Sequence, residues 1–261
     1  MSRPKLVALD VDGTITGADH AVSQRTVASL RRLSDLGIAG VIVSGRTERA
    51  VLRLAGQVGF EAPQVSTNGA LVTDATTGQR LWSKAMDPDD VRTAVAAARR
   101  AGVSPNVWTA DAWYADEDSA SNRLLVTLVG EAPVRQALDE VIAQQAIVKV
   151  MLGGTPAQLD ASGLAGVIPG LERSMPQFFE AAPVGATKQE AVGFLLERLG
   201  IDASQVWGFG DGGNDIGWLG LVGRVFVPDN AQAAVKVLAD QVIGRADNDG
   251  VAEFLDEALI A

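Results

Sequence analysis

Short apolar runs that stop abruptly at polar clusters constrain the fold of this chain most strongly. Residues 6–9 run into Asp10, residues 38–43 into Ser44, and residues 206–209 into Gly210 and Asp211. Runs of this length and composition are typical of strands buried on both faces of a parallel sheet. The carboxyl ends of such strands share one edge of the sheet, so we expect the polar clusters to line a common crevice.

Helical patterns lie between these strands. Residues 23–36 carry apolar side chains at helical spacing, with a serine suited to cap the start and Gly37 after the end. Residues 187–199 repeat this arrangement, and Thr187 and Glu190 have the spacing of a capping box. Further strands are expected at 225–227 and 242–243, and further helices at 231–238 and 251–259. The pattern predicts an α/β protein with a Rossmann-like parallel-sheet core.

The middle of the chain has a different pattern of expected strands and helices. Hairpin-like segments flank a turn at Thr77-Gly78, and amphipathic helices are expected at 89–101 and 133–144. We therefore predict a core formed by residues 1–70 and 184–261, with an α+β cap domain, residues 71–183, inserted into it.

Composition excludes several classes of function. The 261 residues include no cysteine and a single histidine, His20, which excludes disulfides, thiolate zinc sites and sites that need several imidazoles. A net charge of −10 argues against a nucleic-acid partner. No apolar run is long enough to span a bilayer, and the N-terminus lacks the pattern of a secretory signal, so we expect no membrane partner and a cytoplasmic location. The oligomeric state is left open.

The strongest local motif is Asp10-Val11-Asp12-Gly13-Thr14, at the end of the first expected strand. If the loop curls at Gly13, both carboxylates can point into one pocket. Asp10 can then act as a nucleophile and Asp12 as an acid and base. To donate a proton, Asp12 would need a raised pKa. The alternative interpretation is an ordinary turn rich in Asp and Gly.

Complementary groups follow other expected strands or start a helix. They are Ser44-Gly45-Arg46, Lys188, and the run from Gly210 to Asp215, which includes Asp211 and Asn214. Four converging carboxylates, Asp10, Asp12, Asp211 and Asp215, would repel one another and need a hard cation, for which Mg²⁺ is the best match. Ser44 and the neighbouring amides would hold phosphate oxygens.

Lys188 stands in the first turn of its expected helix, where the helix dipole disfavours a cation. Lysine together with helix N-terminal amides is typical of an anion site. Because the dipole opposes the charge, we expect removal of Lys188 to change stability little.

These motifs, in this order, resemble those of the haloacid dehalogenase superfamily: DxDGT, a Ser or Thr, a Lys, and GDxxND. The second aspartate of the first motif, Asp12, resembles the one that the phosphatases of that superfamily carry. The long insertion between Ser44 and Lys188 resembles the Cof-type subfamily of sugar-phosphatase-like enzymes, whose α+β cap is of type IIB. The sequence departs from the subfamily pattern at Gln189, where Gly is usual, at Gly217-Trp218, where a small residue and Met are usual, and at Pro228-Asp229, before Asn230.

The resemblance implies a Mg²⁺-dependent phosphatase that hydrolyses a small phosphorylated metabolite through an aspartyl phosphate on Asp10. It implies metal binding by Asp10, the Asp12 backbone carbonyl and Asp211, with Asp215 or Asn214 completing or supporting the shell. It assigns phosphate binding to Thr14, Ser44, Gly45, Arg46 and Lys188, and substrate contacts to Asn68 and Asn214.

Two alternatives remain open at this point. A phosphomutase of the same superfamily shares the motifs but would need extra cationic cap residues, and those of this cap are spread out. A phospho-acceptor signalling module would carry a reactive aspartate without hydrolysing esters, although such modules are shorter and lack a cap. We expect His20 to be a solvated loop residue.

Overall fold

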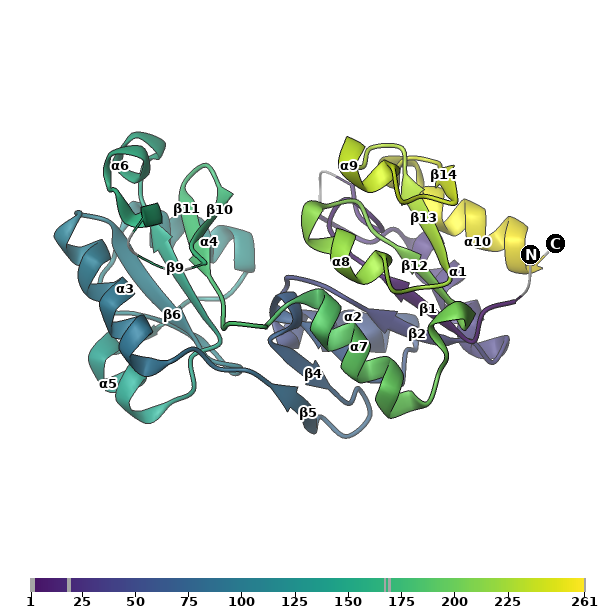
Figure 1. Cartoon of the computed structure of the whole chain (residues 1–261), viewed down its shortest axis with the longest axis horizontal. Helices are drawn as coiled ribbons and strands as arrows, with labels where there is room; N and C mark the ends of the chain where they lie inside the picture. The colour runs from purple at the N-terminus through teal and green to yellow at the C-terminus, as the bar shows by residue number, and fades with distance from the viewer. Residues whose placement is uncertain (1–2, 18–19, 167, 169, 261) are drawn as a thin grey trace. The chain divides into compact units, whose positions relative to one another are not determined.

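The computed structural model describes residues 3–17, 20–166, 168 and 170–260. The chain divides into two compact units (Figure 1). The first comprises Met1–Ser83 and Ala186–Ala261, and the second is the continuous segment Lys84–Gly185. The second unit therefore interrupts the first in sequence.

The first unit combines parallel strands with helices in alternation. Its elements are β1 (Leu6–Leu9), α1 (Gln24–Asp35), β2 (Ala39–Ile42), α2 (Glu48–Val58), β3 (Gln64–Ser66), η1 (Thr67–Gly69), β4 (Leu71–Thr73), β5 (Arg80–Ser83), α7 (Lys188–Leu199), η3 (Ala203–Gln205), β12 (Val206–Phe209), η4 (Gly213–Asp215), α8 (Ile216–Leu219), β13 (Arg224–Pro228), α9 (Ala233–Lys236), β14 (Gln241–Ile243), η5 (Ala246–Asn248) and α10 (Gly250–Ile260).

A five-stranded parallel sheet, in the order β14-β13-β12-β1-β2, forms the centre of this unit (Figure 1). Strand β1 pairs with β12 on one side and with β2 on the other, and Leu9 lies level with both Phe209 and Ile42. The next strand in sequence, β2, lies on one side of β1, whereas β12, β13 and β14 lie on the other. The carboxyl end of β1 is therefore a topological switch point, where α/β proteins bind ligands. The predicted α/β fold class is confirmed.

Successive residues of β1 point into two separate hydrophobic cores. Val7 and Leu9 pack with side chains of α1, α2 and α10, whereas Leu6 and Ala8 pack with side chains of α7 and α8. Since both faces are covered, the strand is apolar throughout and the first polar side chain appears only where it ends.

Strands β3, β4 and β5 form a small antiparallel sheet that belongs to the first unit. A parallel bridge between Val43 and Val65 links it to the end of β2, and the indole of Trp82 donates to the Gly69 carbonyl at 3.1 Å. Residues 71–83 therefore pack with the core, whereas the sequence analysis assigned them to the cap. The hairpin pattern is real, but nothing local indicates which sheet the hairpin joins.

The second unit is an antiparallel α+β domain with the sheet order β10-β11-β9-β6-β7-β8. Helices α3 and α5 cover one face of this sheet. Its elements are α3 (Pro88–Arg100), β6 (Ser104–Trp108), β7 (Trp113–Ala115), α4 (Ala120–Val129), β8 (Val134–Arg135), α5 (Leu138–Gln144), β9 (Lys149–Gly153), α6 (Pro156–Ala161), η2 (Leu164–Gly166), β10 (Glu172–Met175) and β11 (Phe178–Ala181).

The helix expected over residues 133–144 is shorter than predicted. Its first residues form β8, which pairs in parallel with β7, and only Leu138–Gln144 are helical. Tertiary pairing at the open edge of β7 overrides local helix propensity there.

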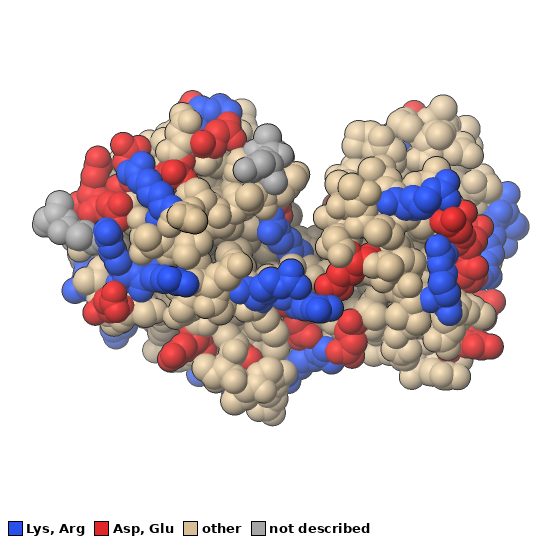
Figure 2. All heavy atoms as spheres, turned by 180° about the vertical axis from the view of Figure 1, so that it is seen from behind, with Lys and Arg blue, Asp and Glu red and all other residues tan. Residues whose placement is uncertain are grey.

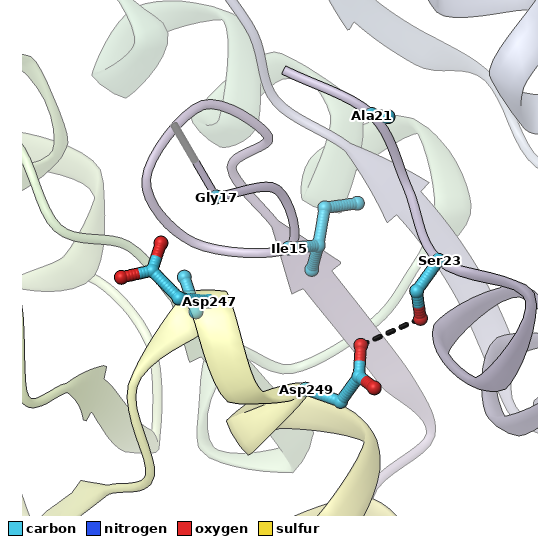
Figure 3. Close-up of a pocket in the computed structure, with 7 residues that line it drawn as sticks. Ile15, Gly17, Ala21, Ser23, Asp247 and Asp249 are labelled. Atoms are coloured by element: carbon cyan, nitrogen blue, oxygen red, sulfur yellow. Dashed lines mark hydrogen bonds between the residues drawn. The ribbon is translucent and has the colours of Figure 1, made fainter. Parts of the chain in front are cut away.

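A pocket of about 220 Å³ lies beside the loop that follows β1 (Figure 3). Ser23 donates to the Asp249 carboxylate at 2.5 Å, as the dashed line in Figure 3 marks, and Thr26 donates to the same oxygen at 3.1 Å. Asp249 adopts a left-handed backbone with φ 58° immediately before α10. These contacts fasten the start of α1 to the start of α10. The pocket is lined by Ile15, Gly17, Ala21, Ser23, Ala246, Asp247 and Asp249.

Two helical glycines of the first unit should respond in opposite ways to alanine. A Cβ on Gly250 would lie 1.9 Å from the Gly244 carbonyl oxygen, whereas a Cβ on Gly193 would meet nothing within 4 Å. We expect Gly250→Ala to lower the free energy of unfolding by about 1–3 kcal/mol. Gly193→Ala should raise it by about 0.5–1 kcal/mol, because alanine loses less backbone freedom on folding. Urea unfolding measures both, and the same sign for both variants would contradict the packing described.

Candidate active site

The loop after β1 curls over the loop after β12. The backbone N–H of Asp10 donates to the Phe209 carbonyl at 2.8 Å, which places Asp10 beside the Gly210-Asp211 turn. Gly13 has φ 84°, and a Cβ there would lie 2.3 Å from an Asp211 carboxylate oxygen. A glycine is therefore required for both the left-handed turn and the close approach to Asp211.

Lys188 joins these loops through two buried ion pairs. Thr187 caps α7 by accepting from the Glu190 N–H at 3.1 Å, so the lysine is the first helical residue. Its Nζ donates to Asp10 Oδ1 at 2.6 Å and to Asp215 Oδ1 at 2.8 Å. The side chains of the three residues are 1%, 8% and 0% exposed, respectively. The capping pattern read from the sequence thus aims the lysine at the carboxyl end of β1.

The burial of Lys188 reverses the expectation that its removal would cost little stability. Burial acts to lower the pKa of Lys188, but the charges of Asp10 and Asp215 and their hydrogen bonds raise it above its ordinary value. The helix dipole is worth only about 0.3–1 kcal/mol near an exposed helix end. Two carboxylates left buried without their cation cost far more.

Three carboxylates converge at this place. One oxygen each of Asp10, Asp211 and Asp215 lie within 4.8 Å of one another, and Thr14 donates to Asp211 Oδ1 at 3.1 Å. Burial, opposed by Lys188 and reinforced by Asp215 and Asp211, raises the pKa of Asp10 to about 7. Burial also raises the pKa of Asp211, although the Thr14 hydrogen bond opposes it. The donors are all oxygens, and two of the carboxyl groups lose their protons less readily than usual because they are buried near other carboxylates. A hard divalent cation fits such a set.

Asp12 lies in a different environment from Asp10, although only one residue separates them. Arg46 donates to both oxygens of the Asp12 carboxylate, at 2.9 and 2.6 Å, and Nδ1 of His20 lies 2.9 Å from one of them. Partial burial acts to raise the pKa of Asp12, but the hydrogen bonds and charges of Arg46 and His20 hold it below its ordinary value. This is opposite to the shift that the sequence analysis expected for a proton donor.

A third group of predicted residues meets around the loop after β2. Ser44 is buried, and its Oγ accepts from the Arg46 backbone N–H at 3.1 Å. Asn214 donates to Asn68 Oδ1 at 3.2 Å, and a Cβ on Gly45 would lie 2.8 Å from the same oxygen. Asn68 has φ 53°, a backbone conformation that asparagine tolerates better than most residues. The site residues predicted from the sequence thus lie in three contiguous groups of the first unit.

Comparison with known proteins connects this geometry to a family. Residues 7–255 match the family described as haloacid dehalogenase-like hydrolase. The chain belongs to this family.

Relatives and solved structures agree with that assignment over nearly the whole chain. A phosphoglycolate phosphatase of Methanopyrus kandleri is 30% identical over 97% of each chain. An HMP-PP phosphatase of Enterobacter sp. (strain 638) is 27% identical, over 96% of this chain and 94% of its own. The crystal structure of a haloacid dehalogenase-like hydrolase from Bacteroides thetaiotaomicron superimposes with a TM-score of 0.88 at 25% identity, over 98% of this chain and 99% of that one.

The Cof-type resemblance read from the motifs is confirmed by these matches, and the chain is an enzyme, a haloacid dehalogenase-like phosphatase.

Within the described residues, no helix is long and apolar enough to cross a membrane. Acidic and basic side chains intermingle on the face of the molecule that Figure 2 displays.

Sequence reasoning missed three residues of this haloacid dehalogenase-like site. His20 is 68% exposed, as expected of a loop residue, yet its ring lies against Asp12. Asn230 donates to the Gly13 carbonyl at 2.7 Å and accepts from the Ala246 N–H at 2.8 Å, which supports the curled loop. Trp218 is fully buried and donates to Asp215 at 2.9 Å. Two of the three are indicated by the sequence: Trp218 as a departure from the family pattern, and Asn230, in the pair Asn230-Ala231, as a match to it.

Replacement of Lys188 by methionine should strongly destabilise the metal-free protein. We expect the free energy of unfolding to fall by about 3–5 kcal/mol, because two buried carboxylates lose their shared cation. The matched control is Lys236→Met, which breaks an ion pair with Asp229 of 2.9 Å at the surface and should lower the free energy of unfolding much less, because solvent screens exposed pairs. Urea unfolding in the presence of a chelator measures both. Equal, small losses would mean that the Lys188 network is not structural.

Proposed function

We propose that this enzyme hydrolyses a small phosphate monoester, such as a sugar phosphate, through an aspartyl phosphate on Asp10. The observation that carries this proposal is the junction of Asp10, Lys188 and Asp211 at the switch point of a parallel sheet. Buried between strand ends, this junction combines an anionic nucleophile with a cation that can face a phosphoryl group.

In the first half-reaction, a carboxylate oxygen of Asp10 attacks phosphorus, and the bond between phosphorus and the ester oxygen breaks. Lys188 and the loop residues Thr14, Ser44, Gly45 and Arg46 would bind the phosphoryl oxygens. The leaving alkoxide takes a proton from Asp12. In the second half-reaction, Asp12 removes a proton from water, the hydroxide attacks phosphorus, and the bond to Asp10 breaks to release inorganic phosphate.

Arg46 would govern which role Asp12 performs. While Arg46 donates to both Asp12 oxygens, the carboxylate is held ionised, which suits a base. A bound phosphoryl group offers Arg46 competing oxygens and would draw the guanidinium away, so that Asp12 can carry a proton for the leaving group.

Mg²⁺ is the cofactor that we propose for this site. Asp10, Asp211 and the Asp12 backbone carbonyl would hold it, with Asp215 or Asn214 in support, and it would neutralise the charge of the phosphoryl group during transfer. The donor set is chemically suited to this ion, because Asp10, Asp211 and Asp215 all offer carboxylate oxygens.

A panel of phosphate monoesters, assayed with and without Mg²⁺, tests the proposed function. Metal-dependent release of inorganic phosphate from a subset of sugar phosphates or similar metabolites is the expected result. Isomerisation of a sugar phosphate that requires added sugar bisphosphate and releases no net phosphate would identify a phosphomutase instead. Stable phosphorylation without turnover of any ester would identify a phospho-acceptor module.

Asn substitutions should separate the roles of Asp10 and Asp12. Asp10→Asn is expected to abolish turnover and to form no phosphoenzyme. Asp12→Asn should make esters with poor alkoxide leaving groups very slow, whereas an activated aryl phosphate still phosphorylates Asp10 and the reaction then stalls for lack of a base. Acid quench with labelled substrate and peptide mapping measures this. Label on another residue, or equal loss for both kinds of ester in Asp12→Asn, would overturn the assignment.

Metal binding should strengthen as pH rises through neutrality. The pKa of Asp10 is raised from 3.8 to about 7 by burial, so between these values the folded protein holds a proton that the metal must displace. We expect the apparent Mg²⁺ affinity to fall about tenfold per pH unit below 7 and to level off above it. Melting temperatures across a MgCl₂ titration at pH 6, 7 and 8 measure this, and identical titrations at pH 6 and 8 would contradict it.

A further inference from the structure

The carboxylate of Asp215 accepts a hydrogen bond at each of its four sites. Oδ2 accepts the backbone N–H groups of Asp211 at 3.1 Å and Gly212 at 3.0 Å. Oδ1 accepts Lys188 Nζ at 2.8 Å and the indole N–H of Trp218 at 2.9 Å. A carboxylate offers about four acceptor positions, so this fully buried group is held in one orientation.

Trp218 is built tightly into the fold behind Asp215. It lies in the short helix α8 and is 0% exposed. Gly208 on β12 makes room for it, because a Cβ there would lie 3.0 Å from the indole ring and 2.9 Å from both Leu219 and Val222. The buried ring packs against the backbone of β12 at Gly208, and its single N–H donates to Asp215.

Three of the positions where the sequence departs from the Cof-type pattern, Gln189, Gly217 and Trp218, are physically connected. Gly217 and Trp218 are neighbours on α8, and a Cβ on Gly217 would lie 2.5 Å from Oε1 of Gln189. Gln189 directly follows Lys188 on α7. Gln189 therefore packs on Gly217 beside the backbone of the lysine, while Asp215 accepts both from the lysine ammonium and from the Trp218 indole.

We propose that Trp218 is a positioning residue, whose indole N–H fixes the Asp215 carboxylate so that Lys188 Nζ is held against Asp10. Methionine and phenylalanine are apolar but smaller, and neither can donate a hydrogen bond. Without that bond, Oδ1 of Asp215 keeps only the hydrogen bond from Lys188, and the ammonium is less well placed for a phosphoryl group. The catalytic consequence rests on the proposed function, whereas the contact itself does not.

Trp218→Phe and Trp207→Phe form a matched pair for the kinetic test. Trp207 is buried on the opposite face of the same sheet, against Phe226 and Phe254. Both variants lose a similar apolar volume, so both should lower the free energy of unfolding. Only Trp218→Phe should reduce kcat/KM for a phosphate ester and weaken competitive inhibition by inorganic phosphate, each by about tenfold, the size expected for a hydrogen bond to a charged group. Trp218→Met should behave like Trp218→Phe.

Equal kinetic losses in Trp218→Phe and Trp207→Phe, or unchanged inhibition by phosphate in Trp218→Phe, would show that Trp218 only fills the core and would overturn the proposal. If the wild-type enzyme released phosphate from no ester, the proposed function would fail instead. The contact can then still be tested by NMR.

The NMR test follows the five indole N–H signals of the chain. The Trp218 signal is assigned by its disappearance in Trp218→Phe or Trp218→Met. Asp215→Asn should shift it much more than the Trp207 signal, because the indole loses a charged acceptor. A Trp218 signal that does not move in Asp215→Asn would overturn the proposal independently of any activity.

Discussion

The buried contact of Lys188 with Asp10 and Asp215 is the interaction on which the rest of the site depends. It connects the end of β1, the first turn of α7 and the loop after β12, which come from opposite ends of the sequence. The free energy cost of burying three charges is offset only because each charge is paired and hydrogen bonded. The parallel sheet makes this possible, since it aligns the strand ends, and apolar cores on both of its faces exclude water from the strands.

Two aspartates of one motif acquire opposite properties from their surroundings. Asp10 is buried among carboxylates and has a raised pKa, whereas Asp12 is partly exposed and is held ionised by Arg46 and His20. Pairs of titratable groups whose environments separate their pKa values commonly divide acid, base and nucleophile roles between them. In the proposed mechanism, this division would depend on whether Arg46 contacts Asp12 or the phosphoryl group.

The boundary between the two units illustrates where local patterns stop being informative. The turn at Thr77-Gly78 correctly indicates a hairpin, but the pairing of β4 with β3 assigns that hairpin to the small antiparallel sheet of the first unit. In the same way, residues 134–135 pair with β7 as a strand instead of continuing α5. Both outcomes depend on an available sheet edge, which a sequence window does not contain.

The α/β class, the helix caps at Ser23 and Thr187, and the family follow from the amino-acid sequence alone, because apolar periodicity and motif spacing are local properties of the chain. The sequence also indicates the residue types of the site, whose individual roles remain proposals. The folded structure is needed to show which charges meet. Lys188 is buried between two carboxylates, Arg46 and His20 contact Asp12, and Trp218 donates to Asp215. These contacts join residues far apart in the chain, and their energies depend on distance and burial, which exist only once the sheet has formed.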